Sequence, residues 1–336
     1  MLDYQLVATI IFLIAGCGMM FNWFITIFIR RLKSLQNPFG RLTGSQAIGE
    51  AIHQTVFALY VAPMVFFDIP WMKENSKHAG TVLLICYEIC IYSHFFISLN
   101  RMCAIFVPLN YNTIFRHIIL NLYLIIYRKF SNTNTTVIIF FTWACALLPS
   151  LYFYTYNDCN LYYIDEYSYF GFTNNPTCLL IAWYAEFIKN CSFVVIICTI
   201  DIITVLRVHL LNIATKTSTS NHHQNKKRRE EINFLKQACL QAFVFTLELI
   251  TYFLLEPMFQ SHFMKFCMTT VAWNLVHSTD GFITIFFNKE FRTVIPCLKR
   301  PTSIASSGNR GQKNAGITPI TEQSPCNSGK PESENS

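Results

Sequence analysis

The sequence predicts an all-α protein that crosses a membrane with seven helices. Hydrophobic residues make up 52% of the 336 residues and charged residues only 13%, whereas soluble domains carry about 25% charged residues. Seven segments reach or approach the length of about 20 mostly apolar residues that a membrane-crossing helix needs. The predicted spans are residues 5–29, 45–69, 79–107, 137–156, 178–206, 233–255 and 263–287.

The positions of Lys and Arg predict the orientation of these spans. All but four of the 26 Lys and Arg residues fall in the odd-numbered connections, at the span ends beside them (Arg101 and Lys236) or after the last span. The exceptions are Lys73, Lys77, Lys189 and Lys265. Cytoplasmic loops are enriched in Lys and Arg, so we expect an extracellular amino terminus and a cytoplasmic carboxyl terminus. No cleavable signal peptide is expected, because the basic residues follow the first apolar run.

Composition also divides the chain and excludes one class of partner. Residues 1–300 form the expected membrane domain, and residues 301–336, rich in Ser, Thr, Pro, Gly and Asn, predict a disordered cytoplasmic tail. The net charge of +7 is spread over separate loops. Since no basic domain or nucleic-acid motif is present, the lipid bilayer and not nucleic acid is the expected partner.

The end of the third span carries a recognisable motif. The segment from Ser98 to Tyr111 reads SLNRMCAIFVPLNY, and Arg101 with the following Pro108, Leu109 and Tyr111 resembles the acid-Arg-aromatic motif and loop of rhodopsin-like seven-helix receptors. Asn100 stands where those receptors usually have an acid. The longer pattern SLNRxCAIFxPLxYxxIF is more similar to the nematode serpentine chemoreceptors of class x.

This resemblance implies a G-protein-coupled chemosensory receptor. Such a protein binds a small environmental ligand from the extracellular side and activates a heterotrimeric G protein, in the plasma membrane and in sensory cilia. Arg101 would be held at rest and released when the sixth helix swings outward; the alternative is an arginine that only marks the interface. Since Asn100 cannot form an ion pair, Glu230 or Glu231 could restrain Arg101, or could simply be acids at a helix amino terminus.

The last span continues into a second motif. Residues Ser278 to Arg292 read STDGFITIFFNKEFR, which resembles the Asn-Pro-x-x-Tyr element of these receptors and the start of the short cytoplasmic helix after it. The second half matches at Asn288, Phe291 and Arg292. In the first half the family's Asn, Pro and Tyr are replaced, and the replacing residues are Asp280, Gly281 and Thr284. Gly281 would loosen the helix locally, and Cys297 beyond the short helix could be palmitoylated.

Ionisable residues inside the spans are the candidates for ligand binding, because charges in a membrane are costly and usually functional. The pocket candidates are Glu88, Glu186, Glu248, His94 and His277. Glu88 and Glu186 could receive a cationic or hydrogen-bonding ligand in a mostly aromatic pocket. Glu248 and Asp280 are expected deeper, in a polar network or a sodium-like site, and each of these residues could instead make only helix–helix hydrogen bonds.

Two further features concern the loops. Cys159 and Cys178 flank a predicted extracellular loop and are expected to form a local disulfide, in preference to the family's usual bond to the third helix, where Cys86 is too deep. The segment Arg116 to Phe130 interrupts the family pattern. Its apolar core is about half the length of a span, so it predicts an interfacial helix or a short intron translated in error.

Other functional classes receive less support. The sequence has no phosphate loop, metal-spaced Cys/His cluster or nucleophile elbow, so we expect neither an enzyme nor a cofactor or metal site. A transporter would show inverted repeats, and a ligand-gated channel of the insect odorant-receptor type would need an intracellular amino terminus. A degenerate, non-signalling receptor stays open, as does assembly into homo- or hetero-oligomers.

Overall fold

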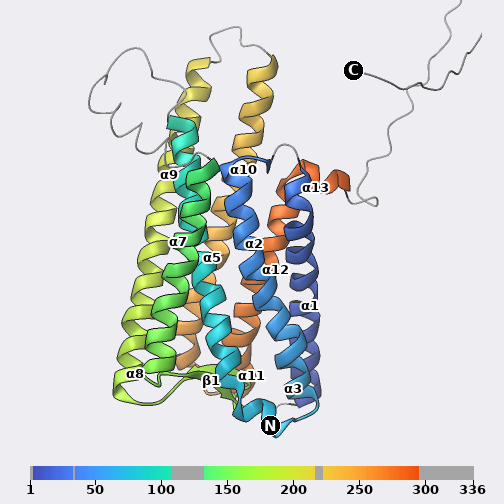
Figure 1. The fold of residues 1–336 in the computed structure, drawn as a ribbon, viewed down its shortest axis with the longest axis vertical. Coiled ribbons are helices and arrows are strands. Elements are labelled where there is room, and N and C mark those ends of the chain that lie inside the picture. Colours follow the sequence, from blue (N-terminus) through green and yellow to red (C-terminus); the bar gives the residue numbers. More distant parts are fainter. Residues whose placement is uncertain (1–2, 33–34, 107–131, 216–221, 295–336) are drawn as a thin grey trace, which may run out of the picture. The chain divides into compact units, whose positions relative to one another are not determined.

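A computed structural model describes residues 3–32, 35–106, 132–215 and 222–294. Within the compact unit Met1–Lys299, seven helical rods run side by side (Figure 1). The predicted insertion, the loop residues Pro108, Leu109 and Tyr111, the possible lipid site at Cys297 and the predicted tail all lie outside the described residues.

The first four rods alternate in direction. The first is α1 (Tyr4–Phe28) with a 3-10 turn at Ile29–Arg31, and the second is α2 (Pro38–Val56), a π-helical turn (Phe57–Val61) and α3 (Ala62–Phe66). Short α4 (Pro70–Glu74) precedes the third rod, α5 (Ser76–Phe106). The fourth is α7 (Asn132–Ser150), which ends in a π-helical segment at Leu151–Tyr156.

The last three rods each contain a π-helical segment near the same end of the bundle. The fifth is α8 (Pro176–Ile181), π-helical Ala182–Ile188 and α9 (Lys189–Thr215), and the sixth is α10 (His222–Ile250), continued by Thr251–Leu255 and Glu256–Met258. The seventh is α11 (His262–Phe266), π-helical Cys267–Val271 and α12 (Ala272–Phe287). Short α13 (Lys289–Val294) follows at the opposite end.

Capping residues explain where several helices start. Asn37 caps α2 by accepting a hydrogen bond from the Gly40 amide at 2.9 Å, and Asn175 caps α8 by accepting one from the Cys178 amide at 2.6 Å. In both helices a proline occupies the first position, where its missing N–H costs nothing. The Asn-Pro pairs therefore fix where the second and fifth rods begin.

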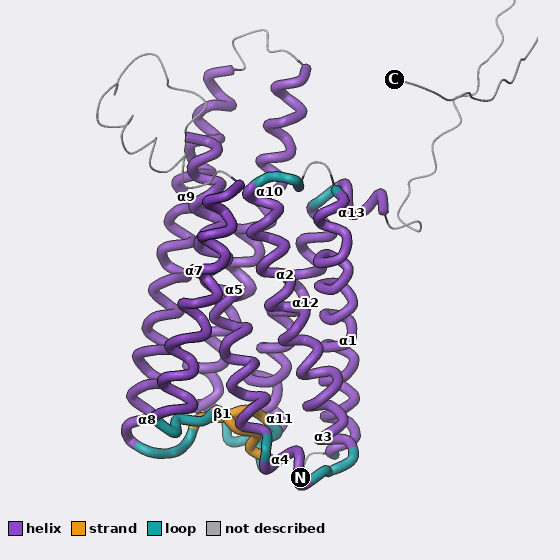
Figure 2. Tube along the Cα trace, viewed as in Figure 1, coloured by secondary structure: helices purple, strands orange, loops and turns teal. Residues whose placement is uncertain are grey.

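A small β-hairpin lies at one end of the bundle. Strands β1 (Leu161–Ile164) and β2 (Tyr169–Phe172) pair antiparallel, with Leu161 opposite Phe172. The hairpin lies beside α8 and α11, at the end where α1 begins (Figure 2). We call this the hairpin end. Because α12 finishes at the other end, the described rods cross the bundle an odd number of times.

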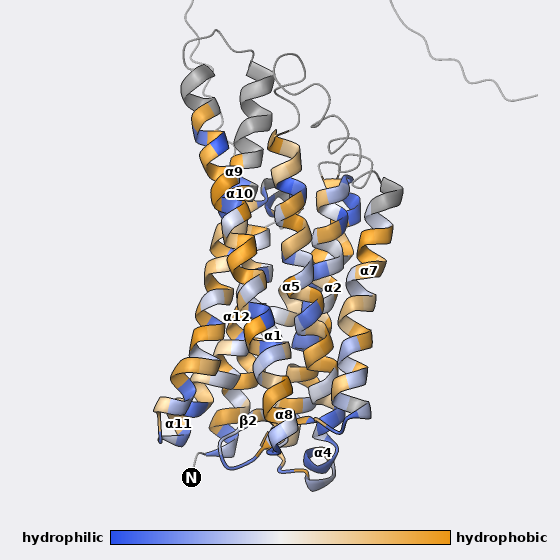
Figure 3. Cartoon of the chain, turned by 90° about the vertical axis from the view of Figure 1, so that its left-hand side faces the viewer, coloured by the Kyte–Doolittle hydropathy of each residue, from blue (hydrophilic) through white to orange (hydrophobic). Residues whose placement is uncertain are grey.

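The helix surfaces fit a lipid environment. Large apolar side chains such as Leu13, Phe140 and Val195 are more than 60% exposed on the outside of the rods, which is expected of residues that face lipid and not water. Hydrophilic positions interrupt the largely hydrophobic helices at mid-height (Figure 3). The prediction of a seven-helix membrane bundle is confirmed.

Five of the rods are long and apolar enough to cross a membrane by composition alone: residues 4–31, 76–106, 135–154, 176–210 and 235–258. The second and seventh rods fall short because they carry buried polar side chains, among them Gln46, Glu50 and His53 on α2 and His277 and Asp280 on α12. These side chains face other helices in place of lipid, so they lower the mean hydropathy without exposing polar groups to the bilayer.

Candidate functional site

A buried polar cluster occupies the middle of the bundle, between α2, α5 and α12. Glu50 accepts a 2.5 Å hydrogen bond from His277, and both side chains are fully enclosed. Gln46 donates to Asp280 at 2.6 Å and lies 2.9 Å from the ring nitrogen of His94. His94 and His277, two of the predicted pocket residues, are therefore brought together here and not in a ligand pocket.

Asp280 belongs to this cluster as well. Its carboxylate lies 3.6 Å from His94, and its backbone carbonyl accepts a hydrogen bond from Gln241 of α10 at 3.5 Å. One helical turn further along, the hydroxyl of Thr284 accepts hydrogen bonds from Gln237 and Gln241. The residues at the family's Asn and Tyr positions thus join the sixth and seventh rods through amides and hydroxyls.

Gly281 allows a close helix approach instead of a bend. Helix α12 runs without interruption from Ala272 to Phe287, and a Cβ atom on Gly281 would lie 2.5 Å from the side-chain oxygen of Asn22. Asn22 in turn donates to the carbonyl of His277 at 3.1 Å. The glycine is needed because the first and seventh rods touch here.

The cluster contains atoms that could hold a metal ion. One ligand atom each from Glu50, Cys90 and His277 lie within 4.8 Å of one another, and so do atoms from Glu50, His94 and Asp280. Nitrogen, sulfur and oxygen ligands together suit a first-row transition ion. The sequence predicted no metal site because it has no metal-spaced Cys/His cluster. The atoms grouped here come from three different helices, α2, α5 and α12.

A pocket lies between this cluster and the hairpin. Its empty space, including the part that is open to the outside, is about 350 Å³, and it is lined by α5, the fifth to seventh rods and both β-strands. Its aromatic residues are Tyr87, Phe172, Tyr252, Phe253 and Trp273, and its polar residues are Glu186, Asn190 and Glu248. Glu186 and Glu248 were predicted as pocket residues, and both line this pocket.

Hydrogen bonds hold the two carboxylates of the pocket. Glu186 accepts from the hydroxyl of Tyr154 and, at 3.3 Å, from the amide of Asn190. Glu248 accepts from the hydroxyl of Tyr87 at 3.0 Å. The partners are neutral groups, so they orient the carboxylates without cancelling their charge.

Glu88, the remaining predicted pocket residue, is not among the residues that line the pocket. It forms a 2.6 Å ion pair with Lys189, and its side chain is 3% exposed. Glu186 is close enough for the two acids to interact electrostatically. Lys189 also interacts electrostatically with Glu186, so it is shared by the two acids. No Lys or Arg is among the residues that line the pocket.

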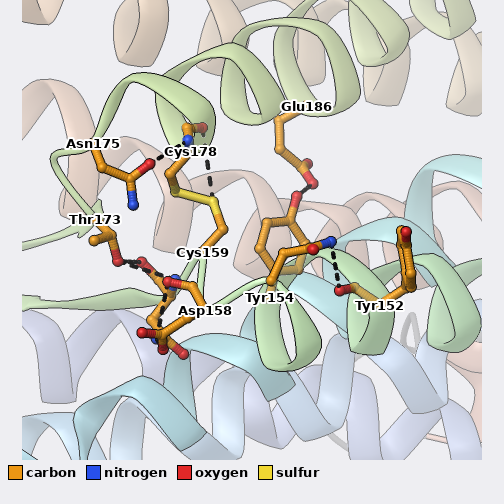
Figure 4. Close-up of a disulfide and its surroundings, with 10 residues drawn as sticks. Tyr152, Tyr154, Asp158, Cys159, Thr173, Asn175, Cys178 and Glu186 are labelled. Carbon is orange, nitrogen blue, oxygen red and sulfur yellow. Dashed lines mark hydrogen bonds between the residues drawn. A yellow bond between two sulfur atoms is a disulfide. The ribbon is translucent and has the colours of Figure 1, made fainter.

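The hairpin covers the pocket and is fastened at several points. The structure contains a disulfide between Cys159 and Cys178, with Cα atoms 5.1 Å apart, close to Tyr154 and Glu186 (Figure 4). Tyr252 donates to the carbonyl of Phe170 at 2.8 Å, so a pocket residue also binds the second strand.

Lys73 connects the hairpin turn to the loop before α4. Its ammonium group lies 2.5 Å from Asp68 and 2.6 Å from Asp165. Partial burial lowers the pKa of Lys73, but hydrogen bonds to Asp165 and Asp68 outweigh this effect and raise it. Lys73 therefore stays protonated and links the two acids.

The other end of the bundle holds Arg101. Its side chain is buried, and its guanidinium lies 4.8 Å from the centre of the Phe39 ring. Asp201 of α9, 2% exposed, lies close enough to interact electrostatically with it. Asn100 is half-buried beside Arg101. The side chains of Glu230 and Glu231, the acids that the sequence suggested as restraints, lie outside the described residues.

The predicted short helix after the seventh rod is present as α13. Asn288 starts it by accepting a hydrogen bond from the Glu290 amide at 2.9 Å. Phe291 is completely buried against Phe24, with ring centres 6.1 Å apart, and Arg292 lies 5.9 Å from the Phe286 ring. These three matched residues thus form and anchor the helix.

Sequence reasoning missed two residues of these sites, Asp201 and Trp273. Asp201 is an acid inside a predicted span, so the rule that singled out the other acids applies to it equally. Trp273 lines the pocket and contacts His53 edge-on at 5.0 Å, while His53 lies 3.8 Å from His277. Trp273 is uncharged and is one of many aromatic residues in a chain with 31 Phe and 16 Tyr, so nothing in the sequence distinguishes it as a site residue.

The arrangement of the rods is that of the rhodopsin-type seven-helix receptors. The fold matches squid rhodopsin with a TM-score of 0.67 over 87% of this chain and 79% of that chain, at 15% sequence identity. The chain is thus a multi-pass membrane protein with the fold of a G-protein-coupled receptor.

Sequence comparison gives the family. The model of the serpentine type 7TM GPCR chemoreceptor Srx matches residues 12–127 and 116–288. Serpentine receptor class X 45 of Caenorhabditis elegans is 32% identical over 311 residues, covering 87% of this chain and 82% of that protein. Serpentine receptor class X-43 of the same nematode is 23% identical over 266 residues, covering 78% and 77%. The chain belongs to the serpentine class x chemoreceptor family. The two matched segments overlap within the predicted insertion.

Proposed function

We propose that this chain is a chemosensory receptor that binds a small environmental ligand in the pocket under the hairpin and activates a heterotrimeric G protein at the Arg101 end. The hairpin end would be extracellular and the Arg101 end cytoplasmic. The asymmetric distribution of Lys and Arg supports this orientation, and the family supports a plasma-membrane site in sensory cilia.

The observation that carries the proposal is a continuous set of contacts from the pocket to the buried polar cluster. Tyr87 and Trp273 line the pocket. The Tyr87 ring lies 5.8 Å from His277, and Trp273 lies 5.0 Å from His53. A ligand that moves either ring would therefore act on the Glu50–His277 pair and, through the cluster, on the contacts between the sixth and seventh rods.

At the far end, Arg101 would serve as the switch. Phe39 and Asp201 come from the second and fifth rods, so Arg101 is held by two neighbours of its own helix. Activation would separate the guanidinium from Phe39 and Asp201, and outward movement of the sixth rod would open a surface beside it for the G protein. This is a two-state element whose equilibrium the ligand biases.

The test is a ligand screen on cells that express the full chain and a version without Arg116–Phe130, read by G-protein dissociation. Arg101→Ala should abolish the response at unchanged surface expression. The control is Arg31→Ala, an exposed arginine near the same end, which should respond normally. A response that survives Arg101→Ala would reject the switch, and a response only without Arg116–Phe130 would favour a non-signalling natural chain.

Orientation has its own test. Epitope tags at the two termini of intact cells should be reached by antibody at the amino end and not at the carboxyl end. Both termini on one side would exclude the proposed receptor, and a transporter or ligand-gated channel would then be examined by flux or current without G protein.

A further inference from the structure

We propose that the ligand of the hairpin-end pocket is a small organic ammonium ion, a protonated amine on a compact apolar body. This inference rests on the proposed function for its biological meaning, but its physical basis is the charge and hydrogen-bonding character of the pocket. It names a ligand class that the family membership does not supply.

The first argument is charge balance. Three acids, Glu88, Glu186 and Glu248, are at most 5% exposed in this region. Lys189 pairs with Glu88 at 2.6 Å, and no Lys or Arg is among the residues that line the pocket. Lys189 also interacts electrostatically with Glu186, so one lysine serves two acids. Glu186 and Glu248 have no cationic partner among the lining residues. A buried carboxylate without a counter-charge is costly, and a cationic ligand would remove that cost.

The second argument is the direction of the hydrogen bonds. Both pocket carboxylates accept hydrogen bonds from neutral groups that are already in place, the hydroxyls of Tyr154 and Tyr87. The amide of Asn190 donates to Glu186 at 3.3 Å, which leaves its carbonyl oxygen fully buried with no partner among the described residues. The pocket therefore offers three acceptors, and a ligand that supplies N–H donors would satisfy them.

The third argument concerns the walls. Five of the ten lining residues are aromatic, including Tyr87, Tyr252 and Trp273. Aromatic faces attract ammonium groups and stabilise them further when water is excluded. The same walls would pack against an apolar body, so the pocket fits an amine better than a carboxylate or a sugar.

The experiment compares matched probes on the purified receptor in lipid nanodiscs, without G protein. Each amine is tested beside a neutral and an acidic partner of similar shape: 2-phenylethylamine with 2-phenylethanol and 3-phenylpropionate, and isoamylamine with isoamyl alcohol and 4-methylpentanoate. Affinity is measured by calorimetry or ligand-induced thermal shift. We expect at least one amine to bind about 30-fold or more tightly than its alcohol partner, the ratio typical when a buried charge partner is lost.

Variants assign the effect to the pocket acids. Glu248→Gln and Glu186→Gln should each weaken amine binding by about tenfold or more while leaving alcohol binding unchanged. The matched control is Glu166→Gln, an exposed acid on the hairpin turn outside the pocket lining, which removes the same charge and should leave affinity unchanged. If either pocket variant fails to fold, the comparison of probes on the natural chain still decides.

The outcomes separate this inference from the proposed function. If no amine binds more tightly than its alcohol partner, or if Glu166→Gln weakens binding as much as the pocket variants, the ligand class is wrong. Glutamate-dependent amine binding without any G-protein response would support the ligand class and reject the signalling role. A G-protein response to the alcohols or acids alone would support signalling and reject the ammonium ligand.

Discussion

The contact between α5 and the hairpin can be tested by a single methyl group at Gly80. A Cβ atom at this position would overlap the carbonyl oxygen of Leu161 and lie 2.8 Å from its carbonyl carbon. These are backbone atoms of β1, so rotation of a side chain cannot relieve the clash. Gly80→Ala should therefore push the hairpin away from the helix.

The hairpin cannot move freely to make room. Leu161 pairs with Phe172 in the two-stranded sheet, and the disulfide at Cys159 lies two residues before it. The amide of Tyr163 donates to the hydroxyl of Ser76 at 3.0 Å, one turn before Gly80 on the same helix. Since each restraint opposes the shift, the full cost of overpacking should appear, about 1–3 kcal/mol.

A matched control removes the effect of helix propensity. Alanine is better than glycine inside a helix by about 1 kcal/mol, which would partly hide the clash. A methyl group on Gly16 of α1 would meet no neighbouring atom within 4 Å, so Gly16→Ala gains the propensity term alone. The difference in free energy of unfolding between the two alanine variants should therefore equal the clash, about 1–3 kcal/mol.

The assay is thermal unfolding of both variants in the same detergent, with proteolysis of the hairpin as a local probe. Gly80→Ala should melt below Gly16→Ala, and its hairpin should be cleaved faster. It should also bind pocket ligands more weakly, because Leu161 is part of the pocket wall. Equal melting temperatures with an equally protected hairpin would refute the close contact between α5 and β1.

Three other substitutions test the remaining parts of the site. Asp201→Asn removes the charge that faces Arg101 and should raise ligand-independent signalling severalfold, measured by G-protein dissociation at equal surface expression. Glu50→Gln breaks the buried pair with His277 and should destabilise the bundle by about 3 kcal/mol, measured as a lower melting temperature. Phe291→Ala empties a completely buried position and should cost about 3 kcal/mol, seen as release of α13 to proteases.

Each of these substitutions has a control that changes the same chemistry elsewhere. Glu166→Gln removes an exposed acid at the hairpin end and is the control for both charge removals, and Phe140→Ala removes a ring that is 75% exposed on the bundle surface. Unchanged basal signalling in Asp201→Asn would exclude it as a restraint on Arg101. Melting temperatures of Glu50→Gln or Phe291→Ala equal to those of their controls would contradict the burial that the structure gives them.

The sequence predicted the rods because their signals are local. Apolar runs and the Asn-x-x-Phe-Arg motif each depend on neighbouring residues. The Asn-Pro pairs at Asn37 and Asn175 are equally local but were not used to predict the spans, and α2 begins at Pro38, ahead of its predicted start at residue 45. Buried polar residues on the second and seventh rods weakened the apolar signal but did not hide it. The length and the approximate position of each span can therefore be predicted from one amino-acid sequence.

Depth and facing of side chains could not be predicted in the same way. His94 is seven residues beyond the pocket residue Tyr87 on α5, so it faces the same side about 10 Å deeper. His277 is four residues beyond the pocket residue Trp273 and about 6 Å deeper. Both histidines were expected in the pocket, and both lie in the cluster below it. The sequence could not predict this, because it does not show at which depth in the bundle the pocket lies.

Contacts between residues far apart in the sequence were the hardest to predict. Gln46 and Asp280 are 234 residues apart, and no local pattern pairs them. The hairpin is another example, because two strands of four residues carry little periodicity, and their place over the pocket depends on Gly80 and Tyr252. The candidate site is therefore mostly a product of tertiary packing, although its acids were identifiable from the cost of charge in a membrane.

Tyr87 is the residue through which ligand charge and receptor state would be linked. A ligand shifts an equilibrium only if it interacts differently with the two states. The Tyr87 hydroxyl donates to Glu248, and its ring lies 5.8 Å from His277 and 6.1 Å from Trp273. On the proposed function, an ammonium ion bound to Glu248 would compete with that hydroxyl, and a released Tyr87 ring would change its packing on the Glu50–His277 pair. Ligand charge, and not ligand size alone, would then set the signal.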